Sequence, residues 1–223
     1  MQYPTKHFSV LSICLIIFIG FIHMSCSSSD DVSPEENPEI NFYALAVGNS
    51  WVYTNLRYNI NTQEYVETNV VDSVSIVNKE LVDGEVFFRF RTKTTGNAND
   101  HPFANSNGEE FELLRDSTGY LIRPDGSVKF TNNNFTPRVI FEESFGLIYD
   151  ELISNQETVM VGAGEFESSY MQRYAIFNDG QRSNATDHFY YSYGVGLIYE
   201  TISFISIENP IGIKTLASYR LAD

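Results

Sequence analysis

The sequence predicts an all-β fold: a single curved antiparallel meander sheet, half-barrel or barrel-like, with at most one or two short helices. Apolar and polar residues alternate along several stretches, as they do when one face of a sheet is buried and the other is wet. The chain contains 14 Tyr and 17 Phe, and both residue types favour strands. Glycine-containing turns separate the alternating stretches, and such short connections join antiparallel neighbours.

The alternating stretches lie between residue 60 and residue 180. The residues that share one parity within a stretch are Val66, Val70, Val74 and Ile76; Val86, Phe88 and Phe90; Phe111 and Leu113, opposite Glu110 and Glu112; and Phe166, Tyr170, Tyr174 and Ile176. The expected turns are Asp83-Gly84, Asn107-Gly108, Pro124-Asp125-Gly126 and Asn178-Asp179-Gly180. We expect about nine to eleven strands. Residues 42–47 and 142–154 are the two candidates for short helices, and closure into a barrel or a sandwich stays open.

Length and composition fit one folded domain. The 223 residues are 43% hydrophobic and 19% charged, which argues against wholesale disorder. Lys plus Arg number 14 and Asp plus Glu number 29, so the net charge is 14 − 29, or −15. The chain lacks a basic stretch long enough to follow a phosphate backbone, so no nucleic-acid partner is expected.

The first 26 residues resemble a bacterial lipoprotein signal peptide. An apolar run covers Phe8–Ile22, small Ser25 precedes Cys26, and His23 stands where the pattern prefers Leu. About 15 apolar residues suit a signal-peptide core and are short for a spanning helix. The resemblance implies cleavage before Cys26 and acyl chains on that residue, which would hold the protein to a membrane. The alternative is an uncleaved single-pass anchor.

The predicted domain boundaries follow from this leader. Residues 1–25 are the lipoprotein signal peptide, and residues 26–40 are the lipidated Cys26 with a disordered acidic tether. Residues 41–223 form the β-rich domain. The SSSDD run after Cys26 resembles the acidic export signal of Bacteroidota-type surface lipoproteins. It implies a lipid-anchored, surface-exposed protein of the outer membrane, with the leaflet left open.

Three motifs in order resemble uncharacterised bacterial surface lipoproteins of the Bacteroidota type. The opening, residues 41–53, reads NFYALAVGNSWVY and is similar to F-x-P-L-x-V-G-N-x-W-x-Y. The second, residues 158–166, reads TVMVGAGEF and is similar to T-V-x-V-P-A-G-x-F. The closing motif, residues 190–200, reads YYSYGVGLIYE and is similar to Y-Y-A-x-G-V-G-L-V-x-x-E. The resemblance implies an all-β domain related to curved half-barrels that carry lipids or lipoproteins, and it assigns no catalytic residue.

The same motifs also have a structural interpretation. Trp51, the sole tryptophan, is expected to plug one end of the core, with a sugar-stacking platform as the alternative. Gly194 and Gly196 are expected to provide a bulge or a close backbone approach, with a ligand-contacting loop as the alternative. The aromatic run at residues 189–193 is expected to pack in the core on one side and against neighbouring strands on the other. Its alternative is an aromatic face for a glycan or an acyl chain.

Catalytic and metal-binding patterns are weak. Beyond the leader the chain has two histidines, His101 and His188, which are too few for a zinc site and are expected to be chance surface residues. The carboxylates that cluster in sequence are Glu109, Glu110, Glu112, Glu142, Glu143, Asp150 and Glu151. We expect these carboxylates to lie on solvated faces, although they are numerous enough to supply the carboxylate pair of a glycosidase. The Asn/Asp-rich segments 97–100 and 178–187 contain oxygen ligands for calcium but lack EF-hand spacing.

These observations together favour a membrane-anchored cell-surface lipoprotein with a non-catalytic binding or envelope-structural role, one that could carry an apolar ligand. The alternative is a secreted glycan hydrolase that uses a carboxylate pair. No enzyme activity, cofactor or metal is expected. The expected partners are the membrane, through Cys26, and a glycan or an apolar ligand.

Overall fold

The computed structural model describes residues 41–99, 101 and 104–222. These residues form twelve β-strands and no helix, so the all-β prediction is confirmed. The strands are β1 (Ser50–Asn59), β2 (Glu64–Val82), β3 (Glu85–Thr95), β4 (Gly108–Ser117), β5 (Tyr120–Ile122), β6 (Val128–Thr131), β7 (Arg138–Glu143), β8 (Gly146–Val161), β9 (Gly164–Phe177), β10 (Arg182–Ser192), β11 (Gly196–Ile202) and β12 (Gly212–Arg220). The expected number was slightly too low, because β5 and β6, with 3 and 4 residues, are too short to show alternation.

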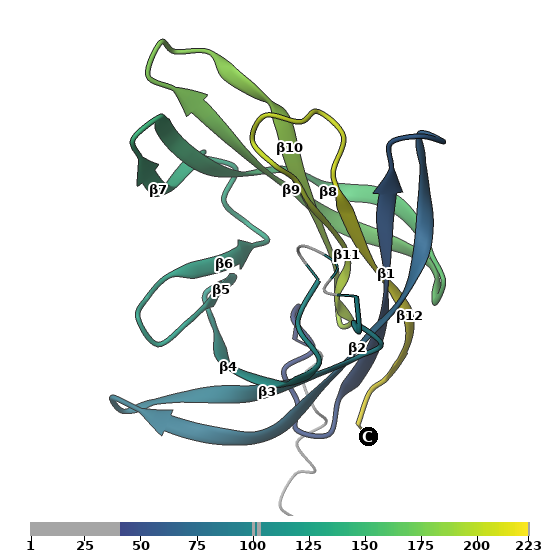
Figure 1. Ribbon diagram of the computed structural model, residues 1–223. Coiled ribbons are helices and arrows are strands. Elements are labelled where there is room, and N and C mark those ends of the chain that lie inside the picture. Colours follow the sequence, from purple (N-terminus) through teal and green to yellow (C-terminus); the bar gives the residue numbers. More distant parts are fainter. Residues whose placement is uncertain (1–40, 100, 102–103, 223) are drawn as a thin grey trace, which may run out of the picture. The chain divides into compact units, whose positions relative to one another are not determined.

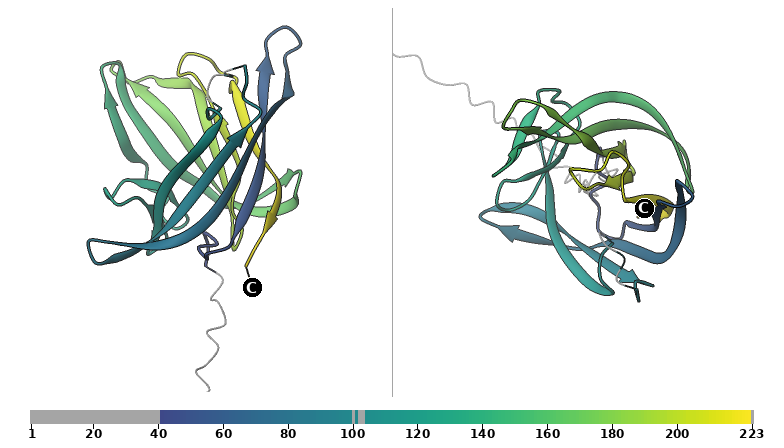
Figure 2. Two further views of the ribbon diagram at one scale, coloured as in Figure 1. Left: turned by 60° about the horizontal axis from the view of Figure 1, so that its bottom comes forward. Right: turned by 45° about the horizontal axis from the view of Figure 1, so that its top comes forward.

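All twelve strands belong to one antiparallel sheet, in the order β6-β5-β4-β3-β2-β1-β12-β11-β10-β9-β8-β7. Every pair of consecutive strands is hydrogen-bonded except β6 and β7, and the first strand pairs with the last. The sheet curls so that its free edges, β6 and β7, come to the same side of the domain (Figures 1 and 2). The fold is therefore an up-and-down meander that closes at its ends and stays open in the middle of the sequence.

The predicted turns lie between strands, as their residue types require. The β2–β3 hairpin turns at Asp83 and Gly84, with φ angles of 51° and 85°, which is the left-handed geometry of a tight hairpin. The turns at residues 124–126 and 178–180 join β5 to β6 and β9 to β10. Asn107-Gly108 leads into β4. These short connections explain why neighbours in sequence are neighbours in the sheet.

Neither candidate helix is present. In residues 42–47 the chain makes a turn, in which Ala44 N donates to Asn41 O at 3.0 Å and Ala44 takes a φ of 52°. Residues 142–154 cover the end of β7, a turn and the whole first half of β8. The helix prediction for this segment was wrong because β8 pairs along its length with β9, and this pairing fixes an extended backbone.

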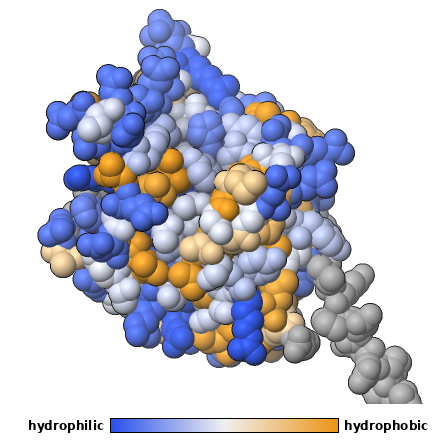
Figure 3. Space-filling view, turned by 90° about the vertical axis from the view of Figure 1, so that its right-hand side faces the viewer, coloured by the Kyte–Doolittle hydropathy of each residue, from blue (hydrophilic) through white to orange (hydrophobic). Residues whose placement is uncertain are grey.

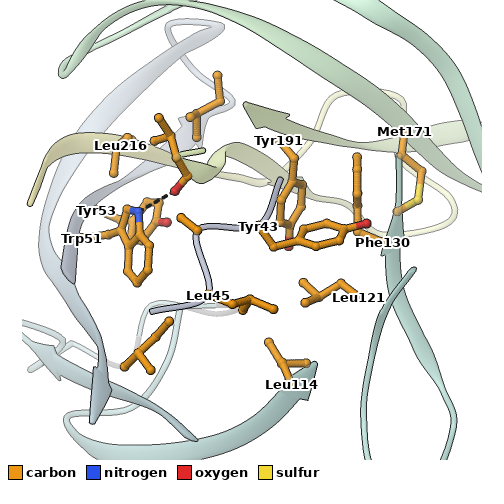
Figure 4. Close-up of a cluster of buried hydrophobic side chains, with 14 of the residues drawn as sticks. Tyr43, Leu45, Trp51, Tyr53, Leu114, Leu121, Phe130, Met171, Tyr191 and Leu216 are labelled. Carbon is orange, nitrogen blue, oxygen red and sulfur yellow. Dashed lines mark hydrogen bonds between the residues drawn. The ribbon is translucent and has the colours of Figure 1, made fainter. Parts of the chain in front are cut away.

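The apolar core lies inside the curl of the sheet (Figure 4). Trp51 is 3% exposed, as the core prediction requires, and its Nε1 donates to Val195 O at 2.7 Å. Tyr43 comes from the segment before β1, packs against Phe130 of β6 and Tyr191 of β10, and donates its hydroxyl to Gly119 O at 2.6 Å. Because Tyr43 and Trp51 bond to backbone far away in sequence, they hold the two halves of the sheet together.

In two strands, aromatic residues that the alternation would place on the buried face lie on the outer face of the sheet instead. In β4, Phe111 is 50% exposed and lies outside over Arg89, whereas Glu112 faces inward. In β9, Met171 points inward, and Tyr170 lies on the outer face with its ring stacked on Tyr190 at 4.6 Å. Aromatic rings can pack across strands on an outer face, so they do not mark the core side by themselves.

Candidate functional site

A cavity of about 730 Å³ lies at the open side of the sheet, between β6 and β7. Small-molecule sites in proteins typically measure about 300–1,000 Å³. Its lining combines apolar side chains with charged ones: Val128, Val139, Ile140, Phe141, Phe189, Tyr191, Arg123, Asp125, Lys129, Arg138, Arg173 and Glu200, together with the turn residues Gly126 and Ser127. The cavity inside the curled sheet is therefore reached through the gap between its two free edges.

A second cavity of about 120 Å³ lies deeper, against Trp51, Tyr53 and Phe90. Lys129, Tyr191 and Glu200 line both cavities, so the two share a wall. Core side chains occupy the rest of the interior. The site therefore differs from the purely apolar cavity expected of a carrier, because charged groups surround the apolar floor.

Glu112 of β4 forms the first charged cluster. Its Oε1 accepts a hydrogen bond from Arg123 Nε at 2.8 Å, and its Oε2 accepts one from Lys129 Nζ at 2.5 Å. Burial alone would raise the pKa of Glu112, but the two cations hold it below its usual value. Glu112 therefore stays ionised near neutral pH and is unsuited to donate a proton. The sequence analysis placed it on a solvated face, which was wrong.

Asp150 of β8 forms the second cluster, with a side chain that is 2% exposed. Arg173 of β9 binds it through two bonds, Nε to Oδ1 at 2.8 Å and Nη2 to Oδ2 at 3.1 Å. Arg138 of β7 approaches Oδ2 with its Nη2 at 3.4 Å. Burial alone would lower the pKa of Arg173, but the contact with Asp150 raises it. Asp150 is also a residue that the sequence analysis placed on a solvated face, which was wrong.

Lys214 of β12 forms the third cluster by joining two carboxylates from different strands. Its Nζ lies 3.2 Å from Asp72 Oδ2 and 3.0 Å from Glu200 Oε1. Asp72 also accepts hydrogen bonds from Thr94 Oγ1 at 2.5 Å and Asn55 Nδ2 at 3.3 Å. Burial alone would lower the pKa of Lys214, but the two carboxylates raise it above its usual value. This cluster is a closed network at the inner wall.

These clusters suit binding better than acid–base catalysis. Five of the 14 Lys and Arg residues of the chain line the two cavities: Arg123, Lys129, Arg138, Arg173 and Lys214. A glycosidase needs one protonated carboxyl group near a second carboxylate. In the three clusters, however, every carboxylate has a cation within 3.4 Å. Charges of both signs beside an apolar floor can hold a ligand that has a polar end and an apolar end.

Asp187 of β10 is the buried acid without an ion pair at hydrogen-bond distance. It lines a third cavity, of about 110 Å³, beside Arg173 and Ser203. Its Oδ1 is buried and has no hydrogen-bond partner within the described part of the chain. Burial raises the pKa of Asp187 to about 6, while Ser203 and Arg173 oppose the rise. The sequence analysis singled out residues 178–187 only as calcium ligands.

The two histidines lie away from the large cavity. His188 is on the outer face of β10, with Nδ1 2.6 Å from the Tyr170 hydroxyl, and burial lowers its pKa. The backbone N of His101 donates to Asn97 Oδ1 at 2.8 Å. No group of three His, Cys, Asp or Glu side chains that could hold a metal occurs in residues 41–99, 101 and 104–222.

The aromatic run at residues 189–193 divides between the two faces of the sheet. Phe189 and Tyr191 line the large cavity, and Tyr190 stacks outside on Tyr170. β10 ends at Ser192, and Gly194 and Gly196, with φ angles of 69° and 91°, form the turn into β11. Gly196 also lines the deeper cavity. The core and cross-strand packing expected of this run are confirmed, and two of its rings also line the site.

The sequence analysis did not single out the cations of the site. Arg173 lies on the inner parity of β9 between Met171 and Ala175, both buried. Lys129 directly precedes Phe130, which is fully buried. A cation inside a run of core positions is the signal that could have indicated a buried charged cluster. Arg138, at the start of an edge strand, gave no such signal.

The predicted lipid-attachment residue, Cys26, lies outside the described residues, as do the whole predicted signal peptide and the whole predicted tether. Among residues 41–99, 101 and 104–222, no helix has the length and apolar character needed to cross a membrane. Figure 3 shows one side of the domain, where apolar residues form small groups separated by hydrophilic ones.

No family model matches the chain, and no curated protein is significantly similar to it. Among solved structures, it is similar to a candidate lipoprotein from Parabacteroides distasonis, with 12% identity over 81% of this chain and 98% of the other and a TM-score of 0.49. It is also similar to a candidate exported protein with a YmcC-like fold from Bacteroides fragilis, with 8% identity over 81% of this chain and 99% of the other and a TM-score of 0.52. The second likeness shows that the domain shares the fold of that Bacteroides fragilis protein.

Proposed function

We propose that this chain is a lipid-anchored protein of the bacterial outer membrane, exposed at the cell surface, that binds a small ligand inside its curled sheet without chemical conversion. The observation that carries the binding role is the 730 Å³ cavity between β6 and β7. Its apolar floor and its charged walls can satisfy both ends of an amphipathic molecule. The proposed envelope location rests on the leader that ends at Cys26. It is supported by the Bacteroides fragilis protein that shares this fold, which is described as exported.

The binding role predicts that Phe189 contributes to affinity, because its ring lines the cavity from β10. Phe189→Ala should weaken binding of the neutral apolar dye N-phenyl-1-naphthylamine by about tenfold or more, since burying an aromatic ring contributes about 1.5–3 kcal/mol. The dye's fluorescence increase on titration measures its dissociation constant. Phe111→Ala is the matched control, because Phe111 lies on the outer face. Wild-type protein that gives no saturable increase, or equal losses in the two variants, would contradict the proposal.

The anchor has its own test. Growth with a palmitate analogue should label the wild-type protein, and Cys26→Ala should remove the label because the attachment sulfur is gone. Labelled Cys26→Ala would show that this residue is not the attachment site. The binding role does not depend on this outcome.

A further inference from the structure

Arg138 uses few of its hydrogen-bond donors within the described part of the chain. A guanidinium has five N–H donors, and good bonds to oxygen measure about 2.7–3.2 Å. Among the described residues, Arg138 makes two hydrogen bonds, both from Nη2 and both at 3.4 Å, to Asp150 Oδ2 and to Val128 O. Asp150 already receives two shorter bonds from Arg173. Most donors of Arg138 are therefore available to another acceptor.

The position of Arg138 makes those donors accessible from the mouth of the cavity. It is the first residue of the free edge β7, its side chain is 29% exposed, and it lines the 730 Å³ cavity. The contact with Val128 O reaches across to the other free edge, β6. An acidic group that enters between the two edges would therefore come within reach of Arg138.

The charges of the two walls differ. On the β5–β6 side, Arg123 and Lys129 pair with Glu112, and Asp125 lines the cavity beside Arg123, so two cations face two carboxylates. On the β7–β9 side, Arg138 and Arg173 share the carboxylate of Asp150, so this cluster has a formal charge of +1. Glu200 also lines the cavity but is paired with Lys214 at 3.0 Å. An incoming anion is therefore favoured at the Arg138 side, although the whole chain is acidic.

Apolar side chains lie next to these cations. Phe189 and Tyr191 form part of the inner wall, and Phe141, 59% exposed, stands with Val139 on the edge strand itself. Lipid-like acids, with a charged head and an apolar body, match this combination. A small sugar or a purely apolar molecule would leave one half of the lining without a partner.

We propose that Arg138 anchors the acidic head group, a carboxylate or a phosphate, of an amphipathic ligand whose apolar part lies against Phe189 and Tyr191. This inference rests on the proposed binding function and names its ligand class. Arg138 acts as the specificity-determining residue, because it presents a bidentate pair of donors that such head groups accept.

Calorimetric titration of the full mature chain with three ten-carbon probes, the acids below their critical micelle concentrations and the alcohol below its aqueous solubility, tests this assignment. The probes are decanoate, decyl phosphate and decanol. Decanoate or decyl phosphate should bind more tightly than decanol, and Arg138→Gln should weaken the acid that binds by about tenfold or more, as expected when a charged hydrogen-bond partner is lost. Decanol should bind Arg138→Gln and wild type equally. Arg138→Lys keeps the charge and should retain part of the affinity.

Arg220→Gln is the matched control, because Arg220 is exposed at the end of β12 and lies outside both cavities. Its affinity for all three probes should equal that of wild type. Equal binding of decanol and the acids, or an unchanged affinity of Arg138→Gln for the acids, would overturn the head-group assignment and leave the proposed binding role standing. Failure of all three probes to bind would overturn both. Thermal melting of Arg138→Gln, expected within a few degrees of wild type because Arg173 still pairs Asp150, shows that a loss of affinity is not unfolding.

Discussion

Lys214 shows how single residues make a charged interior tolerable. Moving an ion from water into a protein costs several kcal/mol, and a partner offsets this cost only when the geometry is good. Lys214 lies about 3 Å from both Asp72 and Glu200; Asp72 also accepts a bond from Thr94 on Oδ1 and one from Asn55 on Oδ2, the oxygen that faces Lys214. Removing the amine would leave two buried carboxylates without a cation. The polar half of the interior is therefore a mutually dependent network, in which each charge needs its neighbours.

Asp187 makes a pH-dependent contribution to stability. Its folded pKa of about 6 lies above the ordinary value of 3.8 that it has in the unfolded chain, so the folded state binds this proton more tightly. The stabilisation is therefore complete below about pH 3.8 and is lost as the pH rises through 6. Asp187→Asn stays neutral at every pH and should be more stable than wild type at pH 7.5 by roughly 1–3 kcal/mol. At pH 4 the two proteins should be nearly equal.

Urea unfolding at both pH values, followed by the fluorescence of Trp51, measures this difference. Glu165→Gln, an exposed change in the same sheet, controls for a general effect of lost negative charge and should follow wild type at both values. An Asp187→Asn protein that follows wild type at pH 7.5 would show that the carboxylate is not penalised in the fold.

At the scale of the element, β4 shows what alternation can and cannot predict. Its period of two identified the strand, but either parity could face the core, and the apolar one, with Phe111 and Leu113, was the natural choice. In the structure Glu112 faces inward, where it accepts hydrogen bonds from Arg123, in the β5–β6 turn, and from Lys129 of β6. A pattern within one strand contains no information about charges that another strand provides, so the face could not be predicted. The hairpin turns, by contrast, depend on local backbone geometry and were predicted correctly.

The sequence also did not predict that β6 and β7 are the free edges of the sheet. Short turns fix which neighbours pair, and they imply nothing about the strands at the ends of the order. β6 and β7 are joined by residues 132–137, a connection as short as many hairpins, yet these two strands do not pair. The cavity exists because of this missing pair, so predicting the site would have required knowing where the meander stays open.

At the scale of the whole molecule, the pairing of β1 with β12 decides where the interior is closed. Asn49, just before β1, accepts a bond from Ala222 N on Oδ1 at 2.6 Å and donates Nδ2 to Ala44 O at 2.7 Å. One side chain thus ties the segment before the first strand to the end of the last strand. The β1–β12 pairing closes the sheet at the chain ends, and the opening falls between the two halves of the sequence, where each half contributes one charged wall.

This arrangement predicts that a circular permutant should fold. The permutant begins at Thr136 and ends at Phe135, both exposed in the β6–β7 connection, and joins Asp223 to Ser27, so that residues 27–40 act as the linker. Fourteen residues can span up to about 46 Å. In the permuted order every strand pair joins sequence neighbours, whereas in the natural chain β1 and β12 pair across most of the domain. Because contacts become more local, refolding should be faster, and the melting temperature should stay within a few degrees of the natural chain.

A second permutant, opened between Gly162 and Ala163 in the β8–β9 turn, is the control. That turn joins two long paired strands, and Ala163 N donates to Leu216 O at 3.0 Å, so opening it should lower the melting temperature and slow refolding. Stopped-flow refolding and thermal melting compare the two. If the Thr136 permutant were the less stable of the pair, the β6–β7 connection would be needed to hold the edges together. The gap between β6 and β7 would then depend on the connection that holds the two edges near each other. The observed topology instead implies that this gap is a stable feature of the sheet.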